Sequence, residues 1–139
     1  MTDLYYKYYL VVYLITAMFS FYLNRNSRGS IFITLILLLD AFVPIPAHFW
    51  YLNCIAIELI VILSTLLTKS YISDVVRYLS VQMVILHIAG MVYHGGSYNS
   101  PYRFLANFTE YLQILSCVIL SNPIINKIKG AVKCHLQKF

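Results

Sequence analysis

Four ionisable side chains lie inside long runs of apolar residues, where charged groups are rare. They are Asp40, Glu58, His87 and Glu110, and the three acids are a majority of the five in the chain. A charged group that faces hydrocarbon at the middle of a membrane helix costs roughly 2.5–3.5 kcal/mol. If these runs cross a membrane, each of the four side chains must face the protein interior, pair with another group, or bind a proton.

The positions of these residues along their runs predict a similar depth for all four. On antiparallel helices with a rise of about 1.5 Å per residue, Asp40 and His87 lie less than about two turns before a turn region, and Glu58 and Glu110 lie about two turns after one. All four are therefore expected in the outer half of the bilayer. Nearby amides could extend this polar layer: Asn53, Gln82, Asn107 and Gln113.

A layer of carboxyl and imidazole groups has two interpretations. Closely placed groups of these kinds can exchange protons or hold a cation, which makes a proton or cation path. The same groups can instead hydrogen-bond between helices, where such contacts stabilise the packing by about 0.6 kcal/mol each on average. The residue types alone leave both interpretations open.

Catalytic and metal chemistry have less support. The acids and His87 are acceptable metal ligands, but the Glu-x-x-His pairs of di-iron bundles are missing from the sequence. The sequence also has no G-x-S-x-G motif and no Cys/His spacing that would mark a nucleophile. We therefore expect no catalytic residue, no metal site and no cofactor, and we expect that the chain is not an enzyme.

The composition predicts the environment in which these residues are held. Hydrophobic residues make up 60% of the chain and charged residues 11%, against roughly 45–50% and about 25% in soluble proteins. A chain of 139 residues with so few charges could not cover a surface that faces water. The net charge of +5 comes from basic residues in short loops and in the tail, so we expect a lipid bilayer and not nucleic acid as the partner.

Five apolar runs predict an all-α bundle of transmembrane helices within residues 1–123. The expected spans are about 8–23, 31–47, 50–68, 75–93 and 103–121. The second run is short, because about 20 residues are needed to cross the hydrocarbon core. A re-entrant hairpin with the third run is the alternative. The first run lacks a cleavage-site pattern and is interpreted as a retained anchor, not a signal peptide.

The distribution of lysine and arginine predicts the orientation. With five spans, Lys7 and Arg103 fall on one side of the membrane. The other side holds eight basic residues: Arg25, Arg28, Lys69, Arg77, Lys127, Lys129, Lys133 and Lys138. Because cytoplasmic loops are rich in such residues, the N-terminus is expected outside and the C-terminus in the cytoplasm. This pattern is typical of a multi-pass protein of an inner or plasma membrane.

The tail, residues 124–139, has an amphipathic pattern of its own. At about 100° per residue its apolar residues fall within one arc: Ile124, Ile125, Ile128, Ala131, Val132, Leu136 and Phe139. Lys129 and Lys133 lie opposite this arc, and Lys127 and Lys138 flank it. We expect an interfacial helix whose four lysines bind the anionic inner leaflet. Packing of the same face on a partner or on a neighbouring subunit is the alternative.

These observations predict a small integral membrane protein, acting as an oligomer, that permeabilises the bilayer or conducts protons or cations. Short spans, small loops and a lysine-rich tail give it an outline similar to that of holins and other small pore formers, although this resemblance covers no particular residue. A non-catalytic membrane subunit or assembly anchor of a larger complex is the second hypothesis. An enzyme that acts within the membrane is the third. The expected protein partners are therefore further copies of the chain or other membrane subunits.

Overall fold

The computed structural model describes residues 2–44, 50–94 and 100–138, and these ranges form six α-helices without a strand. The helices are α1 (Thr2–Leu23), α2 (Arg28–Phe42), α3 (Trp50–Leu66), α4 (Tyr71–His94), α5 (Ser100–Ile119) and α6 (Asn122–Leu136). The all-α prediction is confirmed. Each expected span coincides with one of the first five helices, although α2 ends at Phe42 and the stretch from 45 to 47 lies outside the described residues.

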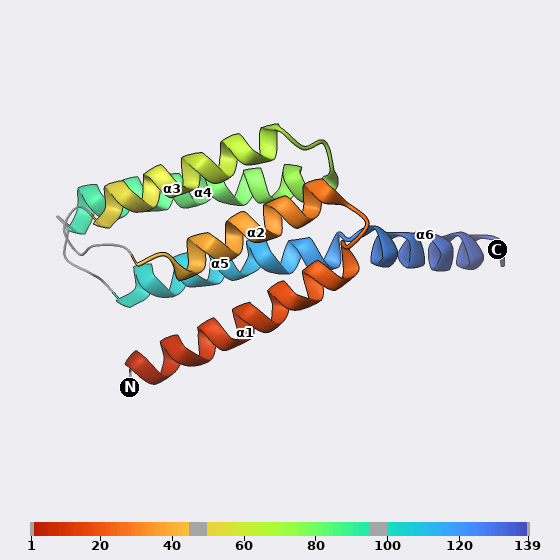
Figure 1. Cartoon of the computed structure of the whole chain (residues 1–139), viewed down its shortest axis with the longest axis horizontal. Coiled ribbons are helices and arrows are strands. Elements are labelled where there is room, and N and C mark those ends of the chain that lie inside the picture. The colour runs from red at the N-terminus through yellow and green to blue at the C-terminus, as the bar shows by residue number, and fades with distance from the viewer. Residues whose placement is uncertain (1, 45–49, 95–99, 139) are drawn as a thin grey trace.

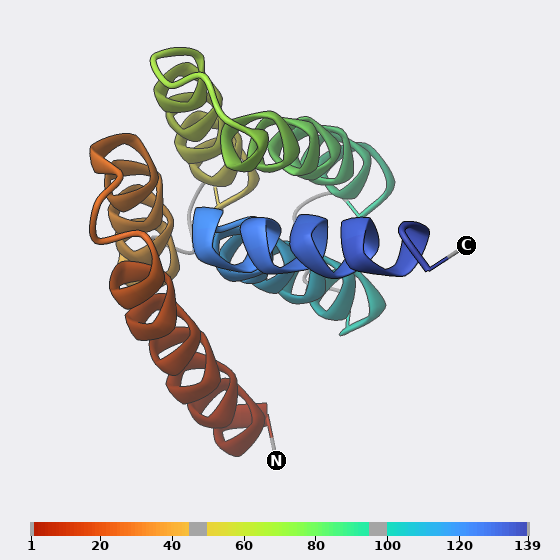
Figure 2. The same ribbon diagram turned by 90° about the vertical axis from the view of Figure 1, so that its right-hand side faces the viewer.

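The first five helices run up and down beside one another, and α6 leaves the bundle at one end (Figure 1). The helix α4 packs along α3 on one side and along α5 on the other, and α5 in turn packs along α1 and α2. The end-on view shows α6 directed away from the axis of the bundle (Figure 2). A bend of 66° separates α6 from α5, at the point where Pro123 lies in the first turn of α6.

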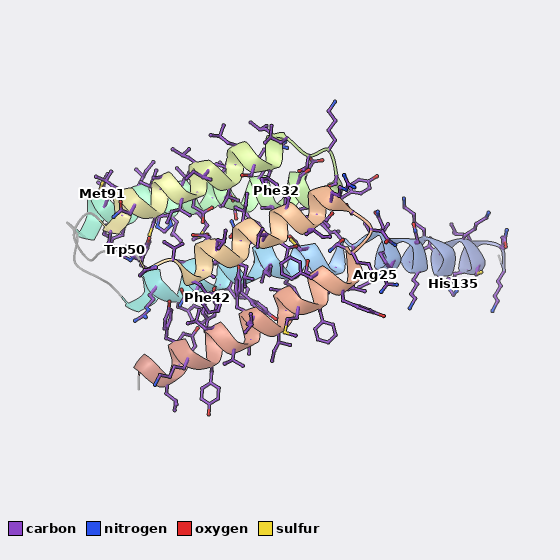
Figure 3. The ribbon with its side chains drawn as sticks, in the orientation of Figure 1. Arg25, Phe32, Phe42, Trp50, Met91 and His135 are labelled. Carbon is purple, nitrogen blue, oxygen red and sulfur yellow. The ribbon has the colours of Figure 1, made fainter. Side chains whose placement is uncertain are left out.

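The two ends of the bundle differ in composition. We call one the aromatic end; it holds the starts of α1, α3 and α5, and Trp50 lies there (Figure 3). We call the other the tail end; it holds the α1–α2 turn with Arg25, the α3–α4 turn and the start of α6 (Figure 3). The antiparallel order of the helices therefore brings turns that are distant in sequence to the same end.

The core consists of two clusters of buried side chains. The larger cluster fills the middle and the tail end, and includes Tyr13, Ile33, Leu37, Val61 and Ile114. The smaller cluster lies at the aromatic end and contains Tyr51, Met83, Tyr102 and Ala106. Between them the helices leave room for polar side chains that point inward.

Large apolar side chains also cover the outside of the bundle. Leu67 is 80% exposed and Val92 is 68% exposed, and several exposed large apolar side chains occur on each of the first five helices. Contiguous apolar surface of this extent is typical of contact with lipid or with other proteins. It fits association of the chain with a membrane.

Two helices are long and apolar enough to cross a membrane, at Leu4–Leu23 and Tyr71–Val92. A third span is added if α5 and α6, separated by their bend, are counted as one. The helices α2 and α3 have 15 and 17 residues, which is shorter than the roughly 20 residues that a full crossing needs. Five spans and their orientation therefore stay a prediction.

Candidate functional site

The structure brings the four predicted residues together on the wall of one cavity at the aromatic end. The cavity has a volume of about 230 Å³. Each of the first five helices contributes to its wall, with Tyr9 on α1, Asp40 on α2, Glu58 on α3, His87 on α4 and Glu110 on α5. Residues separated by up to 101 positions in sequence thus share one small space.

Glu110 is held by a tyrosine of the first helix. The hydroxyl of Tyr9 donates a hydrogen bond to Oε2 of Glu110 at 2.8 Å, and both side chains are only partly exposed. A hydrogen bond to a carboxylate is stronger than one between neutral groups. This contact joins α1 to α5 at the edge of the cavity.

Glu58 is the most deeply buried acid and has an amide partner. Glu58 is 3% exposed, and its Oε2 accepts a hydrogen bond from Nε2 of Gln113 at 3.3 Å. The same amide nitrogen donates to Oγ of Ser80 at 2.8 Å. Oε1 of Gln113 is buried and has no hydrogen-bond partner within the described ranges, so this polar group retains an unused acceptor.

His87 lies in an aromatic cluster. Its Nδ1 is hydrogen-bonded to the hydroxyl of Tyr102, and the Trp50 ring stands edge-on at 5.9 Å between centroids. Gly90 lies one turn further along α4, where an added Cβ would come within 2.7 Å of Cε1 of Tyr51. A glycine at this position lets the rings of α3 and α5 approach the backbone of α4.

Asp40 is the least restrained of the acids. It is half-buried at the cavity wall, and no hydrogen bond or ion pair joins it to another residue in the described part of the chain. A buried polar group without a partner is costly. Its carboxyl group is therefore available to a ligand that enters the cavity.

One basic residue shares the cavity with the acids. Arg103 lines it, and the guanidinium carbon lies 5.4 Å from the centroid of the Tyr6 ring, a cation–π geometry. Three carboxyl groups thus face one guanidinium. Because charges of one sign repel strongly in a medium of low dielectric constant, the excess of carboxyl groups favours uptake of protons or of a small cation.

Two residues that line this cavity, Tyr9 and Arg103, were not predicted from the sequence as members of the site. Arg103 entered only the count of basic residues. Nothing in the local sequence relates Tyr9 to Glu110, because their contact depends on the pairing of α1 with α5. For Arg103 the sequence did contain a signal: it lies about two helical turns before Glu110 on the same helix, which places both on a similar helix face.

The amides expected to extend the polar layer behave differently from one another. Gln113 is fully buried and bonded to Glu58, and Asn107 lines the cavity. Asn53 is half-buried and is not part of the cavity wall. Gln82 is exposed, so its expected place in the layer was wrong. Gln82 lies five positions before His87 on α4, so the two side chains point in directions that differ by about 140° around the helix axis.

Apolar side chains of the core lie on the tail-end side of the cavity. Leu37, Val61, Val76 and Ile114 are each at most 1% exposed and belong to the larger core cluster. Tyr13 adds its ring to this cluster and donates its hydroxyl to the carbonyl oxygen of Leu37 at 3.0 Å. We call these five residues the apolar layer. Four of its members lie three or four positions from a cavity-lining residue of the same helix, on the side of the tail end.

The predicted surface-binding lysines belong to the tail helix and the residues after it. The helix α6 contains Lys127, Lys129 and Lys133, and Lys138 follows its end. All four are exposed. The Nζ atom of Lys129 lies 5.9 Å from the centroid of the Tyr71 ring, at the start of α4.

The apolar residues of α6 form an exposed stripe. Ile128, Val132 and Leu136 are 53%, 52% and 69% exposed and follow one another at intervals of four residues. Ile124 and Ile125, near the bundle, are half-buried, and Phe139 of the predicted arc lies outside the described residues. None of the residues of α6 is buried, so this stripe is open to a partner or to lipid.

Within the described ranges, no group of three or more histidine, cysteine, aspartate and glutamate residues is arranged to hold a metal ion. Comparison with known proteins adds no further information: no protein-family model, no curated protein and no solved structure matches this chain. Arguments about its function therefore depend on its own residues.

Proposed function

We propose that this chain is a multi-pass protein of an inner or plasma membrane that takes up protons or small cations in the acidic cavity and conducts them as an oligomer. The observation that carries the proposal is the convergence of Asp40, Glu58 and Glu110, with His87, on a single cavity of about 230 Å³. Buried acids at membrane depth are expensive to maintain and typically mark ion or proton routes.

The proposal includes five spans. The two short helices have 15 and 17 residues, which corresponds to lengths of about 22 and 26 Å at a rise of 1.5 Å per residue. A bilayer accommodates short hydrophobic segments by local thinning, at a modest cost for each ångström of mismatch. Their exposed apolar residues, such as Leu39 on α2 and Leu63 on α3, support contact with lipid.

The orientation in the proposal has the aromatic end outside. The tail end holds most of the basic side chains, including Arg25, Arg28 and Lys69 in its turns, as is typical of a cytoplasmic face. If α5 is parallel to the membrane normal, its bend of 66° leaves α6 about 24° (90° minus 66°) from the membrane plane. A basic helix at such an angle suits the surface of an anionic leaflet.

The apolar layer acts as the gate in this proposal. Its buried side chains lie between the level of the cavity and the tail end, and hydrophobic constrictions gate channels by excluding water. A bundle of five helices is too small to enclose a wide path, so conduction requires several copies. The cavity then serves as the outer entrance, where a proton or cation loses its hydration to carboxyl groups.

Reconstitution into sealed vesicles tests this function. The full chain is placed in phosphatidylcholine and phosphatidylglycerol vesicles that contain a pH-sensitive dye, and flux is measured after an imposed potential. We expect proton flux above that of empty vesicles. Glu58→Gln and Glu110→Gln should each lower it severalfold, because both remove a titratable group while keeping the hydrogen-bonding shape of the side chain.

A matched control is Asp74→Asn. Asp74 is an exposed acid at the tail end that pairs with Arg77 at 3.5 Å, so its loss should leave the flux unchanged. Circular dichroism and size-exclusion profiles check that every variant is folded. Flux equal to that of empty vesicles, or equal flux in wild type and both glutamate variants, would contradict the proposal.

A membrane subunit or assembly anchor is the second candidate, favoured by the exposed stripe of α6. Ile128→Ser with Val132→Ser should abolish co-purification of a partner chain if this stripe is an interface. Asn126→Ser, an exposed position on the same helix outside the apolar arc, is the control. Retention of every co-purifying chain by the double variant would argue against this function.

A further inference from the structure

An apolar groove lies next to the cavity, between α1 and α5. It has a volume of about 290 Å³. Its apolar lining comes from the first turns of both helices: Tyr5, Tyr8, Val12, Phe104, Phe108 and Tyr111. Phe104 and Phe108 stack with their ring planes 8° apart. A flat aromatic wall of this kind suits an acyl chain.

The groove and the cavity share a wall. Tyr9 and Asn107 line both spaces, and they lie where α1 contacts α5. The hydroxyl of Tyr9 is bonded to Glu110 on the cavity side. Nδ2 of Asn107 is buried and has no hydrogen-bond partner in the described part of the chain. An unsatisfied donor between an apolar groove and a polar cavity indicates that an acceptor from a ligand belongs there.

The charged groups that line the cavity lie at different positions along α5 and α2. Arg103 lies near the start of α5, and Glu110 lies seven residues further along it, which is about 10 Å at 1.5 Å per residue. Asp40, without a partner in the described ranges, faces the same space from α2. A positive group thus precedes negative groups on the way inward, beside an apolar groove.

We propose that a lipid of the phosphatidylethanolamine type binds across the line of contact between α1 and α5. One acyl chain lies in the groove, the phosphate is bound by Arg103 and Asn107, and the ammonium group reaches Asp40 and Glu110. The inference rests on the proposed function in one respect, which is that the carboxyl groups of the cavity accept a cation. It adds that the cation can be the head of a membrane lipid.

The chemistry of the cavity selects this head group among common lipids. An ammonium group has three N–H donors, which match carboxylate acceptors, whereas the trimethylammonium of phosphatidylcholine has none. Phosphatidylglycerol offers a phosphate for Arg103 but no cation for the acids. The cavity volume of about 230 Å³ equals about eight water molecules at roughly 30 Å³ each, enough for a small head group.

The test measures binding of phosphatidylethanolamine with a fluorescent label on its acyl chain. The full chain is purified in detergent, stripped of lipid and titrated, with anisotropy as the readout. Unlabelled phosphatidylethanolamine should compete. Phosphatidylcholine lacks the N–H donors, phosphatidylglycerol lacks the cation and free ethanolamine lacks the phosphate and the acyl chain, so each should compete at least about tenfold more weakly. Equal competition by any of these three would overturn the proposal.

Paired variants locate the site. Arg103→Gln and Glu110→Gln should each weaken binding about tenfold or more, as expected for loss of a charged hydrogen bond. Arg25→Gln is the matched control for the first, since Arg25 lies 4.8 Å above the ring of Tyr22 at the tail end. Asp74→Asn is the control for the second. Equal weakening by the controls, or no weakening by the two cavity variants, would refute the assignment.

The vesicle experiment separates this inference from the proposed function, because those vesicles contain no aminolipid. Flux that depends on Glu58 and Glu110 without selective lipid binding would refute the lipid site alone. Selective binding without flux would refute conduction and leave the lipid site standing.

Discussion

Both ends of the bundle bury polar side chains, but they bury different kinds. The aromatic end encloses three carboxyl groups and an imidazole around an open space. The tail end buries hydroxyl and amide groups that satisfy one another or the backbone. Ser20 and Thr34 are 2.7 Å apart, and Nδ2 of Asn24 donates to the carbonyl oxygen of Cys117 at 2.9 Å. The first arrangement suits a ligand and the second suits packing.

The difference follows from the cost of each group inside a membrane. A hydroxyl or amide that finds one partner is satisfied and stabilises the contact by a modest amount. A carboxyl group needs a proton, a cation or several donors. The hydroxyl contacts are therefore sufficient to explain helix association at the tail end. The acids of the aromatic end exceed what association requires.

The largest expected effect comes from the boundary between the two ends. Leu37→Ala opens a void in the apolar layer and should lower the free energy of unfolding by about 2–5 kcal/mol, since Leu37 is completely buried. Leu39→Ala on the exposed side of the same helix, 56% exposed, is the control and should cost far less. Reversible unfolding in mixed micelles measures both. Equal losses would show that no sealed layer separates the ends.

A smaller effect is expected from crowding the aromatic cluster. Gly90→Ala puts a methyl group against Tyr51 and should destabilise the protein by about 1–3 kcal/mol, as overpacking does. Gly130→Ala on α6, where nothing lies within 4 Å of the added atom, is the control. It should be neutral or should favour the helix, because alanine has the higher helix propensity. The same unfolding measurement compares them.

The smallest effect separates packing from chemistry. Ser20→Ala at the tail end should cost about 0.6 kcal/mol, the average for hydrogen bonds between membrane helices, and should leave ion flux unchanged. Tyr9→Phe at the aromatic end removes one hydrogen bond to Glu110 and should cost up to about twice as much stability, because the acceptor is a carboxyl group, and it should also change the flux. Equal effects of the two variants on flux would show that the polar groups of the two ends do not differ in function.

Much of the helical arrangement was predictable from the sequence, because apolar runs broken by polar turns mark helices in a membrane protein. The limits of α3 were predicted within about two residues, at Trp50 and Leu66. The stretch at the start of α1 was less predictable, since Lys7 and its tyrosines resemble a surface segment, although the structure continues α1 from Thr2. Tyrosine occurs both at membrane surfaces and on packed helix faces, so its presence does not decide between the two.

The candidate site was predictable as a set of residues but not as a geometry. Charged side chains in apolar runs are conspicuous, so Asp40, Glu58, His87 and Glu110 could be named. Whether they share a space depends on the rotation of each helix, which local sequence does not determine. Gln82 illustrates the limit, because its depth fitted the layer while its direction around α4 did not.

Because every one of the first five helices supplies part of the cavity wall, the site cannot exist before synthesis of the bundle is complete. If the helices insert into a bilayer one after another, as the proposed topology requires, Asp40 and Glu58 enter it before α5 is present and must be neutralised by protons or shielded by the insertion machinery. Under that proposal a nascent or truncated chain would expose unsatisfied acids to lipid, a feature that membrane quality control could recognise.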